Sequence, residues 1–389
     1  MNTIIQNDLT YVAGTYARFP AALVNGKGAK AYDETGKEYI DLGSGIAVNT
    51  FGYSDEIWKN AVINQIDAIS HTSNLYYTDP CTTLAKMLCE KTGMKKVFFG
   101  NSGAEANECA VKVARKWAYE KYGDESHNNV ITLINSFHGR TIAMLSATGQ
   151  EHFHHFFGPF PEGFLYAEAN NLKSVRKLIE ENKCCAVLIE IIQGEGGVMP
   201  LSSSFISGVQ ALCSENDLLF MVDEVQTGNG RTGELFAYMN YGVQPDVVST
   251  AKGLGGGLPI GACLIGDKAK DALKSGDHGS TFGGNPIACA GAVSILERLT
   301  DDVMKGVKER SSYIFDALNG AKNVKSISGI GLMIGIEVEG NAREIVNRLL
   351  ERGVLALTAK TKIRLLPPLN IDFDDLKKAI GILKEEIAK

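Results

Sequence analysis

Between about residues 95 and 270, short apolar runs alternate with segments whose apolar residues recur at helical spacing. This alternation is typical of βαβ units and predicts an α/β fold with a largely parallel sheet. Ligands of such sheets bind at the carboxyl ends of the strands, so the residues that follow the strands are candidates for chemistry. The predicted strands are Lys96–Phe99, Val130–Ile134, Ala186–Ile189, Leu218–Val222, Val247–Ala251 and Gly261–Ile265.

The segments on either side of this region have a different pattern. Ala29–Tyr32 and Glu38–Leu42 flank the turn residues 33–36, which predicts a β-hairpin. Apolar residues of the closing segment fall on one helical face, which predicts that this helix packs on a small C-terminal domain. These residues are Leu376, Ala379, Ile380, Leu383 and Ile387.

The length of the chain predicts more than one domain, because 389 residues exceed the size at which a single core usually stops growing. We expect a large domain over residues 51–285, with a mostly parallel central sheet flanked by helices. Residues 1–50 and 286–389 are expected to form a smaller α+β domain. The sequence shows neither internal repeats nor low-complexity tracts.

Composition narrows the functional classes. Hydrophobic residues make up 44% and charged residues 22%, as in an ordinary globular protein. The net charge of −6 gives no general attraction for nucleic acid or an anionic membrane, so an anionic substrate needs local arginines. The N-terminus lacks the pattern of a signal peptide and no apolar run approaches membrane-spanning length, so we expect a cytoplasmic protein.

The eight cysteines are scattered, with no Cys-x-x-Cys pair and no histidine at metal-ligand spacing. We therefore expect reduced, mostly buried thiols. No metal site is expected.

The strongest local signal is the segment 97–105, Val-Phe-Phe-Gly-Asn-Ser-Gly-Ala-Glu, in which a predicted strand leads through a glycine turn into a helix. Ser102 can cap this helix, and Glu105 three residues later completes a capping box. Free N–H groups and the helix dipole at such a helix start favour anions, so a phosphate would fit. An ordinary capped helix explains the same residues equally well. The segment is neither a Walker loop nor a G-x-G-x-x-G turn.

A second signal is the apolar strand Leu218–Val222, which ends in Asp223 and Glu224 at the edge of the sheet where ligands bind. A carboxylate there can stabilise a protonated ring nitrogen, which an electron-sink cofactor needs. Acids that merely cap a loop are commoner. Asp223 alone therefore does not establish a function.

A third signal is Lys252, which follows an apolar strand and precedes the small residues of the segment 253–259, Gly-Leu-Gly-Gly-Gly-Leu-Pro. Small residues let a ligand approach closely. Partial desolvation would lower the pKa of such a lysine and make its amine a nucleophile for a carbonyl. Most lysines are only solubilising charges, and the local context is what distinguishes this one.

Together, the three signals supply a phosphate seat, an acid for a ring nitrogen and an amine for an aldehyde. Those are the three groups that pyridoxal phosphate needs. No single signal is decisive.

The sequence also resembles the class III aminotransferases of pyridoxal-phosphate fold type I, over nearly its whole length. Seven matches in order are far more specific than any one of them. Where members of the family commonly read Gly-His-x-His-Pro, this chain has Gly-Tyr-Ser-Asp-Glu at residues 52–56. The matching segments are Thr15–Pro20, Ser44–Asn49, Asn101–Glu108, Ser136–Thr141, Gln193–Gly197, Asp223–Gly228 and Thr281–Pro286.

The resemblance implies a role for each residue around the cofactor. Lys252 would carry pyridoxal phosphate as a Schiff base and later move the proton between substrate and cofactor. Asp223 would hold the pyridine nitrogen protonated, and Gln226 would reach the ring hydroxyl. Phe137 would stack on the ring.

The same resemblance implies how the phosphate is held. Gly103 and Ala104 would bind it through their backbone N–H groups, and Ser102 would cap the same turn. Thr281 would reach the phosphate of the neighbouring subunit. A homodimer with shared active sites is implied.

Substrate recognition is expected to depend on arginines. By the resemblance, Arg140 would contact the carboxylate of an acylated ornithine, with Ser280 nearby and Tyr16 in the same site. Arg364 would grip the α-carboxylate of glutamate or 2-oxoglutarate bidentately. Glu195 would neutralise Arg364 while the amino donor is bound and swing aside for the dicarboxylate.

The expected reaction is a ping-pong transfer of the terminal amine of an acylated ornithine to 2-oxoglutarate. Three alternatives stay open from the sequence. Ornithine or 4-aminobutyrate as the donor would change only side-chain recognition. An aminomutase would need no external keto acid, and a non-enzymatic sensor would show no turnover.

Overall fold

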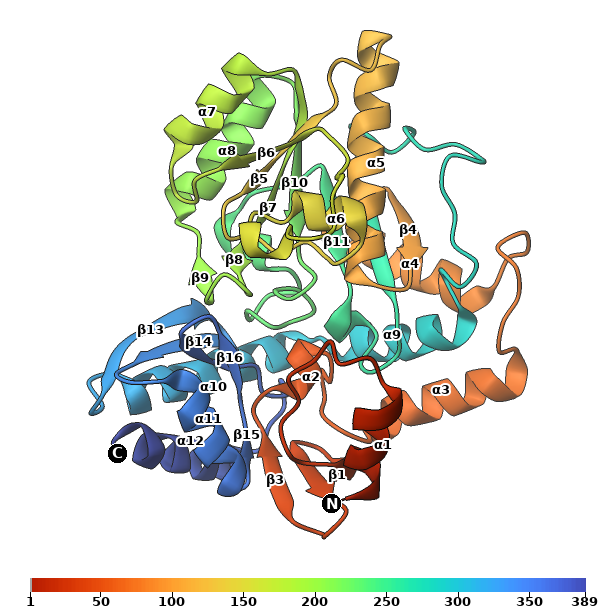
Figure 1. The fold of residues 1–389 in the computed structure, drawn as a ribbon. Coiled ribbons are helices and arrows are strands. Elements are labelled where there is room, and N and C mark those ends of the chain that lie inside the picture. Colours follow the sequence, from red (N-terminus) through yellow and green to blue (C-terminus); the bar gives the residue numbers. More distant parts are fainter. Residues whose placement is uncertain (1) are drawn as a thin grey trace.

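The computed structural model describes residues 2–389, and its largest element is a seven-stranded sheet in the upper half of Figure 1. Strand pairs in this sheet are parallel except those that β12 makes with β11 and β4. The expected α/β fold with a mostly parallel central sheet is confirmed. In spatial order the strands are β4 (Lys96–Gly100), β12 (Gly261–Ile265), β11 (Val247–Thr250), β10 (Leu219–Asp223), β7 (Cys184–Glu190), β5 (Asn129–Leu133) and β6 (Phe164–Ala167).

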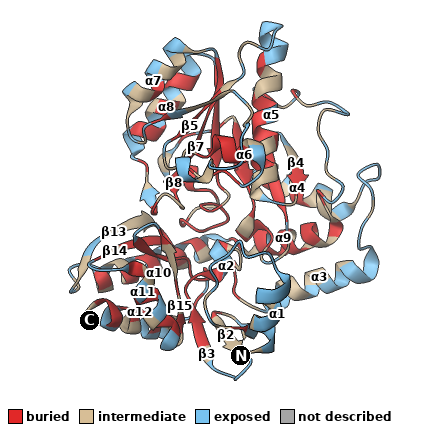
Figure 2. Ribbon diagram, viewed as in Figure 1, coloured by how far each residue is buried: buried red, intermediate tan, exposed pale blue. Residues whose placement is uncertain are grey.

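Helices cover both faces of this sheet, which explains why its central strands are continuously apolar. Along β10, Leu219 and Met221 join the core under α5, whereas Phe220 and Val222 join the core under α8. Figure 2 shows the strands as buried between these layers. The helices of this part are α5 (Gly103–Tyr122), α6 (Ile142–Ala147), α7 (Leu172–Glu181) and α8 (Ser203–Glu215), with the short 3-10 turns η1 (Glu151–Phe153), η2 (Ala237–Tyr241) and η3 (Lys252–Leu254).

Two smaller sheets lie in the lower half of Figure 1. One contains the expected N-terminal hairpin, and the C-terminal strand β15 extends it by pairing parallel to β3. The other has the order β13-β14-β17-β16. Strands β8 and β9 form a separate two-stranded sheet. Their strands are β1 (Leu23–Lys27), β2 (Lys30–Asp33), β3 (Glu38–Asp41), β8 (Ile192–Gln193), β9 (Met199–Pro200), β13 (Val324–Ile330), β14 (Met333–Val338), β15 (Val354–Leu355), β16 (Leu357–Ala359) and β17 (Lys362–Leu365).

Because β15 joins the hairpin, the N-terminal and C-terminal segments share one sheet, which supports a composite smaller domain. We propose the division into residues 1–50, 51–285 and 286–389 on this basis. Helix α9 packs on α3 and α4, so the last segment also contacts the middle one. The remaining helices are α1 (Thr3–Tyr11), α2 (Ser44–Ala47), α3 (Glu56–Ala68), α4 (Asp79–Thr92), α9 (Pro286–Arg298), α10 (Asp301–Leu318), α11 (Ala342–Glu351) and α12 (Phe373–Ile387).

All eight cysteines are free thiols; Cys81 and Cys89 are half-buried and the others are buried. Across residues 2–389, no helix is both long enough and apolar enough to cross a membrane.

The C-terminal helix α12 is anchored through Glu386, whose carboxylate is buried. It accepts hydrogen bonds from Arg348 Nε at 3.1 Å, Arg352 Nη1 at 3.0 Å and Lys389 Nζ at 2.6 Å. Burial alone would raise the pKa of Glu386, but these three cations outweigh burial and lower it to about 2.

Glu386→Gln is expected to lower the free energy of unfolding at pH 7 by about 1.5–3 kcal/mol, the usual worth of hydrogen bonds to a charged group. The folded-state pKa lies below the unfolded value of about 4.3, so this stabilisation is complete above pH 4.3 and is lost as pH falls towards 2. Urea unfolding at pH 7 and pH 3 measures both effects. Glu385→Gln, at an exposed carboxylate that pairs only with Arg352, is the matched control. An equal loss at both pH values would contradict the role of the charge.

Candidate active site

A cavity of about 590 Å³ opens at the carboxyl ends of β10 and β11, beside the first turn of α5. This is the edge at which parallel sheets bind ligands. The structure brings nine of the predicted site residues together there. They are Tyr16, Ser102, Gly103, Ala104, Phe137, Arg140, Asp223, Gln226 and Lys252.

Lys252 lies two residues after the end of β11 and begins η3. Its backbone has φ = 46°, a left-handed conformation that costs free energy for any residue other than glycine and is typical of functional sites. Burial lowers the pKa of its amine below the ordinary lysine value, and the guanidinium of Arg364 adds to this. The carboxylates of Glu195 and Asp223 oppose the shift. A lowered pKa enlarges the fraction of free amine, which is the form that attacks carbonyls.

Asp223 ends β10 and is buried, with only 4% of its surface exposed. Its Oδ2 atom accepts hydrogen bonds from Asn107 Nδ2 at 2.7 Å and from His138 Nδ1 at 2.8 Å. Its Oδ1 atom accepts one from the backbone N–H of Val225 at 3.0 Å. Three donated hydrogen bonds hold this buried carboxylate in a single position.

The start of α5 presents free backbone donors to the cavity. Ser102 caps the helix as expected, because its hydroxyl accepts from the N–H of Glu105 at 3.2 Å. The reciprocal half of the capping box differs from the prediction, since the Glu105 carboxylate accepts from the N–H of Asn101 instead of Ser102. Gly103 and Ala104 are the first residues of the helix, so their N–H groups have no intrahelical acceptor and can bind an anion.

Phe137 lines the cavity and its backbone is fixed by Glu190, whose Oε2 accepts from the N–H of Phe137 at 3.0 Å. Burial and the repulsion from Asp223 raise the pKa of Glu190 well above its usual range.

A Cβ on Gly103 would lie 2.6 Å from Val225 Cγ1, so this close packing requires glycine at the phosphate seat.

Gln226 and Glu195 both hold Arg364, which lies on β17 with only 3% of its surface exposed. Arg364 Nη1 donates to Glu195 Oε1 at 2.6 Å and to Gln226 Oε1 at 3.2 Å. Its Nε atom is buried and has no protein partner within residues 2–389. A buried guanidinium with an unfilled donor beside a cavity is suited to an incoming carboxylate.

Arg140 sits at the rim of the cavity and is exposed. Its guanidinium carbon lies 4.0 Å from the ring centre of Phe153 and 5.4 Å from that of Phe137. The two aromatic rings therefore orient its charge without neutralising it. A carboxylate at the cavity mouth can pair with Arg140.

Ser280 and Thr281 do not line the cavity of their own chain. Ser280 Oγ accepts hydrogen bonds from Asn101 Nδ2 at 3.1 Å and from the N–H of Gly283 at 3.0 Å, and Thr281 is exposed. Asn74 Nδ2 donates to the carbonyl of Ser280 at 2.9 Å, which fixes this turn at the surface.

Four residues of the site were missed by sequence analysis. Asn107, His138, Glu190 and Ser249 are buried around Asp223 and Phe137. The signal that could have found Asn107 is an amide on the apolar face of α5, between buried alanines and valines. His138 lies inside the matched segment Ser136–Thr141, and Glu190 lies just before Gln193–Gly197. Ser249 is close to none of the matched segments, and no distinctive pattern marks these three residues.

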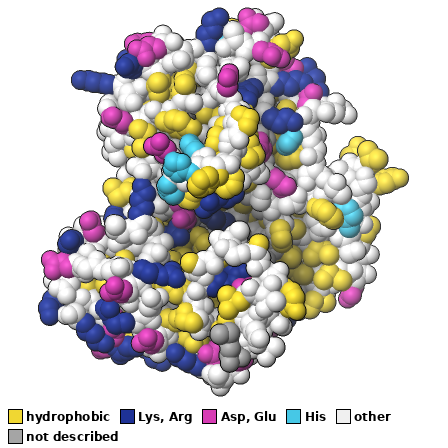
Figure 3. All heavy atoms as spheres, in the orientation of Figure 1, with side chains coloured by type: hydrophobic (Ala, Val, Ile, Leu, Met, Phe, Trp, Pro, Cys, Tyr) yellow, Lys and Arg dark blue, Asp and Glu magenta, His cyan; other side chains and the backbone are white. Residues whose placement is uncertain are grey.

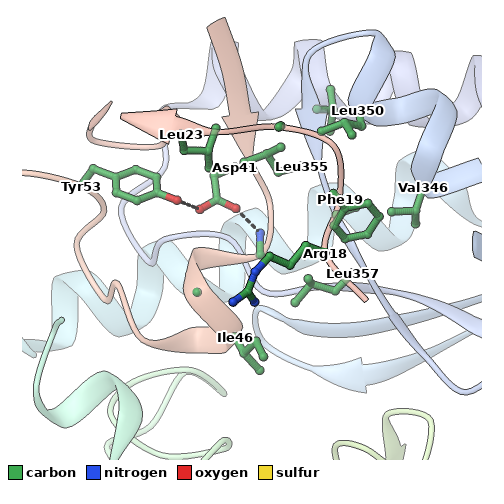
Figure 4. A pocket seen from close by; sticks show the side chains of 15 residues that line it. Arg18, Phe19, Leu23, Asp41, Ile46, Tyr53, Val346, Leu350, Leu355 and Leu357 are labelled. Carbon is green, nitrogen blue, oxygen red and sulfur yellow. Dashed lines mark hydrogen bonds between the residues drawn. The ribbon is translucent and has the colours of Figure 1, made fainter. Parts of the chain in front are cut away.

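A second cavity, of about 340 Å³, lies between the N-terminal segment and the C-terminal helices (Figure 4). Its two charged groups already have protein partners. Arg18 pairs with Asp8 at 2.9 Å, and Asp41 accepts from the hydroxyl of Tyr53 at 2.7 Å and from the N–H of Gly43 at 2.7 Å. Tyr53 belongs to the segment 52–56 that departs from the family, and here it anchors Asp41. The walls of this second cavity are mostly aliphatic and supply no amine, so it is not the candidate active site.

The residues around the larger cavity fit pyridoxal phosphate. Backbone donors at a helix start, a buried carboxylate, an amine and an aromatic face surround one space of suitable size. In the described part of the chain, residues 2–389, no cluster of three or more His, Cys, Asp and Glu side chains could hold a metal ion.

Comparisons with known proteins agree with this geometry. The family model for aminotransferase class III matches residues 11–387. The chain is 49% identical to an acetylornithine aminotransferase of Haemophilus ducreyi, over 99% of this chain and 98% of that protein. It is 42% identical to a succinylornithine transaminase of Yersinia enterocolitica, over 96% and 94%. The crystal structure of an ornithine aminotransferase from Toxoplasma gondii superposes with a TM-score of 0.95 at 32% identity, covering 99% of this chain and 94% of that one.

The chain therefore belongs to the class III aminotransferases. This confirms the family, the fold type and the enzyme class expected from the sequence. Pyridoxal phosphate, the cofactor of this family, is confirmed with them.

Proposed function

We propose that this enzyme transfers the terminal amine of N2-acetyl-L-ornithine to 2-oxoglutarate, giving N-acetyl-L-glutamate 5-semialdehyde and L-glutamate. The observation that carries the proposal is the buried Arg364, which pairs with Glu195 and also donates to Gln226 in the wall of the cavity that holds Lys252. Relatives that are named for acetylornithine support this donor over others. Such a reaction belongs to arginine biosynthesis.

The cofactor, when bound, supplies an aldehyde and a ring that delocalises the negative charge formed on the substrate carbon. Lys252 would bind it covalently through its amine and, when free, would hold and return the proton of the substrate. Asp223 would keep the ring nitrogen protonated, and Gln226 would reach the ring hydroxyl. Phe137 would stack on the ring.

The phosphate is held at the start of α5. The N–H groups of Gly103 and Ala104 donate to it, and Ser102 keeps this turn in place through its cap. This anchorage would set how far the ring lies from Lys252, which follows β11, a strand that packs against α5.

Two substrates can share one site because Arg364 has an exchangeable partner. Glu195 neutralises it while the acylated ornithine is bound, so the buried charge is never left unpaired. When 2-oxoglutarate enters, its α-carboxylate replaces Glu195 and pairs with the guanidinium in a bidentate geometry. Arg140 binds the substrate carboxylate at the rim, with Tyr16 and Ser280 nearby.

We also propose a homodimer in which Thr281 reaches the phosphate of the partner's site. Thr281 is exposed and lies outside its own cavity, and the Phe282 beside it is 60% exposed. Hydrophobic side chains gather on this flank, over α3 and the loop that follows it, at the right of Figure 3. A large exposed apolar area of this kind marks an interface. The exposed residues of this apolar area include Ile57, Ile63, Ile66, Ile69, Leu75, Tyr76 and Tyr77.

A cytoplasmic location stays a prediction.

A substrate panel tests the proposed reaction. We expect kcat/KM with acetylornithine to exceed that with ornithine or 4-aminobutyrate by at least about 10-fold, because ornithine keeps a charged α-amine and 4-aminobutyrate lacks the acylamino group. Succinylornithine is expected to react at a rate closer to that of acetylornithine. All rates should fall to background without 2-oxoglutarate. Turnover without a keto acid would instead indicate an aminomutase.

A further inference from the structure

The buried side-chain amide of Asn107 contacts residues from three parts of the site that would hold the cofactor. It lies on α5, one turn after the phosphate seat, with only 1% of its surface exposed. Its Nδ2 atom donates to Asp223 Oδ2 at 2.7 Å and to the carbonyl of His138, next to Phe137, at 2.9 Å. Its Oδ1 atom accepts from the hydroxyl of Ser249, three residues before Lys252.

The orientation of this amide is determined by its neighbours. Asp223 Oδ2 and the His138 carbonyl can only accept, so both must face the NH₂ group of Asn107. The Oδ1 atom then faces Ser249, whose hydroxyl must donate to it. Every donor and acceptor of the amide is thereby used, and a fully satisfied buried polar group is held in one position.

We propose that Asn107, set by Ser249, is the positioning residue that holds Asp223 at the ring nitrogen of the cofactor and fixes its distance from the phosphate seat. This inference rests on the proposed function. His138 Nδ1 donates to the same oxygen of Asp223, so the loss of Asn107 would leave Asp223 with one side-chain donor in place of two. The amide also joins α5 to the ends of β10 and β11, which lie side by side in the sheet (Figure 1).

The test compares the holoenzyme with Asn107→Leu, Ser249→Ala and the double variant. Asn107→Leu should weaken pyridoxal phosphate binding to the apoenzyme by about 10- to 100-fold, the expected loss for a hydrogen bond to a buried charge. The NMR signal of an isotopically labelled ring nitrogen should move towards that of the unprotonated ring. The kcat value should fall by a similar factor, with KM for 2-oxoglutarate unchanged within about twofold.

Ser249→Ala should show the same changes at about 3- to 10-fold, because it removes a neutral hydrogen bond and leaves the amide oxygen without its donor, so the amide is held less firmly. In the Asn107→Leu background this substitution should add nothing, since Ser249 acts through the amide. Val113→Ala, at a buried apolar position of the same helix, is the control for general loss of stability. It should leave the ring-nitrogen signal unchanged.

An unchanged ring-nitrogen signal in folded Asn107→Leu would overturn the inference, as would additive effects in the double variant. If Asn107→Leu does not fold, Ser249→Ala decides alone through the same signal. Failure of the wild-type enzyme to bind pyridoxal phosphate or to transaminate would instead refute the proposed function.

Discussion

Lys252→Ala is expected to lower kcat by at least about 10³-fold while the protein stays folded. General acid–base catalysis by one residue contributes about 10²–10⁴-fold, and the covalent attachment of the cofactor is lost as well. Among the described residues that line the cavity, Lys252 supplies the only amine, so no neighbour can replace it. Steady-state turnover with the acylated donor and 2-oxoglutarate measures the loss, and circular dichroism checks the fold.

Added methylamine should restore part of this activity, because a small amine can enter the space left by the side chain and carry the proton. Lys270→Ala, at a half-buried lysine that pairs with Asp267 outside the cavity, is the control and should retain wild-type rates. If Lys252→Ala keeps near-wild-type turnover, the assignment of the central amine is wrong. If methylamine has no effect on a variant that binds cofactor, Lys252 acts only in attachment.

Strands of the large sheet could be predicted because their signal is local. Buried parallel strands are continuous apolar runs, and the six predicted strands match observed ones with ends that differ by at most two residues. The strand that was missed, β6 (Phe164–Ala167), lies at the edge of the sheet and is only partly buried. An edge strand needs fewer apolar residues, so its pattern does not stand out from a loop.

Site residues could be predicted where they end a strand or start a helix. Asp223, Lys252 and Ser102 each occupy such a position, and the sheet brings these positions together whatever the details of packing. Asn107 and Ser249 are different, because their contacts join residues 116 and 142 positions apart. Nothing in the local sequence reveals which buried polar side chains meet after folding.

The second prediction with a large effect concerns Arg364, at which the α-carboxylate of the substrate replaces Glu195. Arg364→Ala should lower kcat/KM for 2-oxoglutarate by about 10²–10³-fold, since two charge-assisted hydrogen bonds to the α-carboxylate are lost. The half-reaction with acetylornithine should change by less than about 10-fold, because that substrate does not pair with Arg364. Stopped-flow measurement of each half-reaction, followed by cofactor absorbance, separates the two effects.

Glu195→Gln should produce the opposite asymmetry. Without this carboxylate, Arg364 stays buried and unpaired while the acylated ornithine is bound, so that half-reaction should slow by about 10-fold. The half-reaction with glutamate should hold or quicken, because the dicarboxylate no longer competes with Glu195 for the guanidinium. Gln226, which also accepts a hydrogen bond from Arg364, is not altered in this variant, so the comparison tests Glu195 alone. Equal losses in the two half-reactions would show that Glu195 only supports Arg364 and does not switch the site between its substrates.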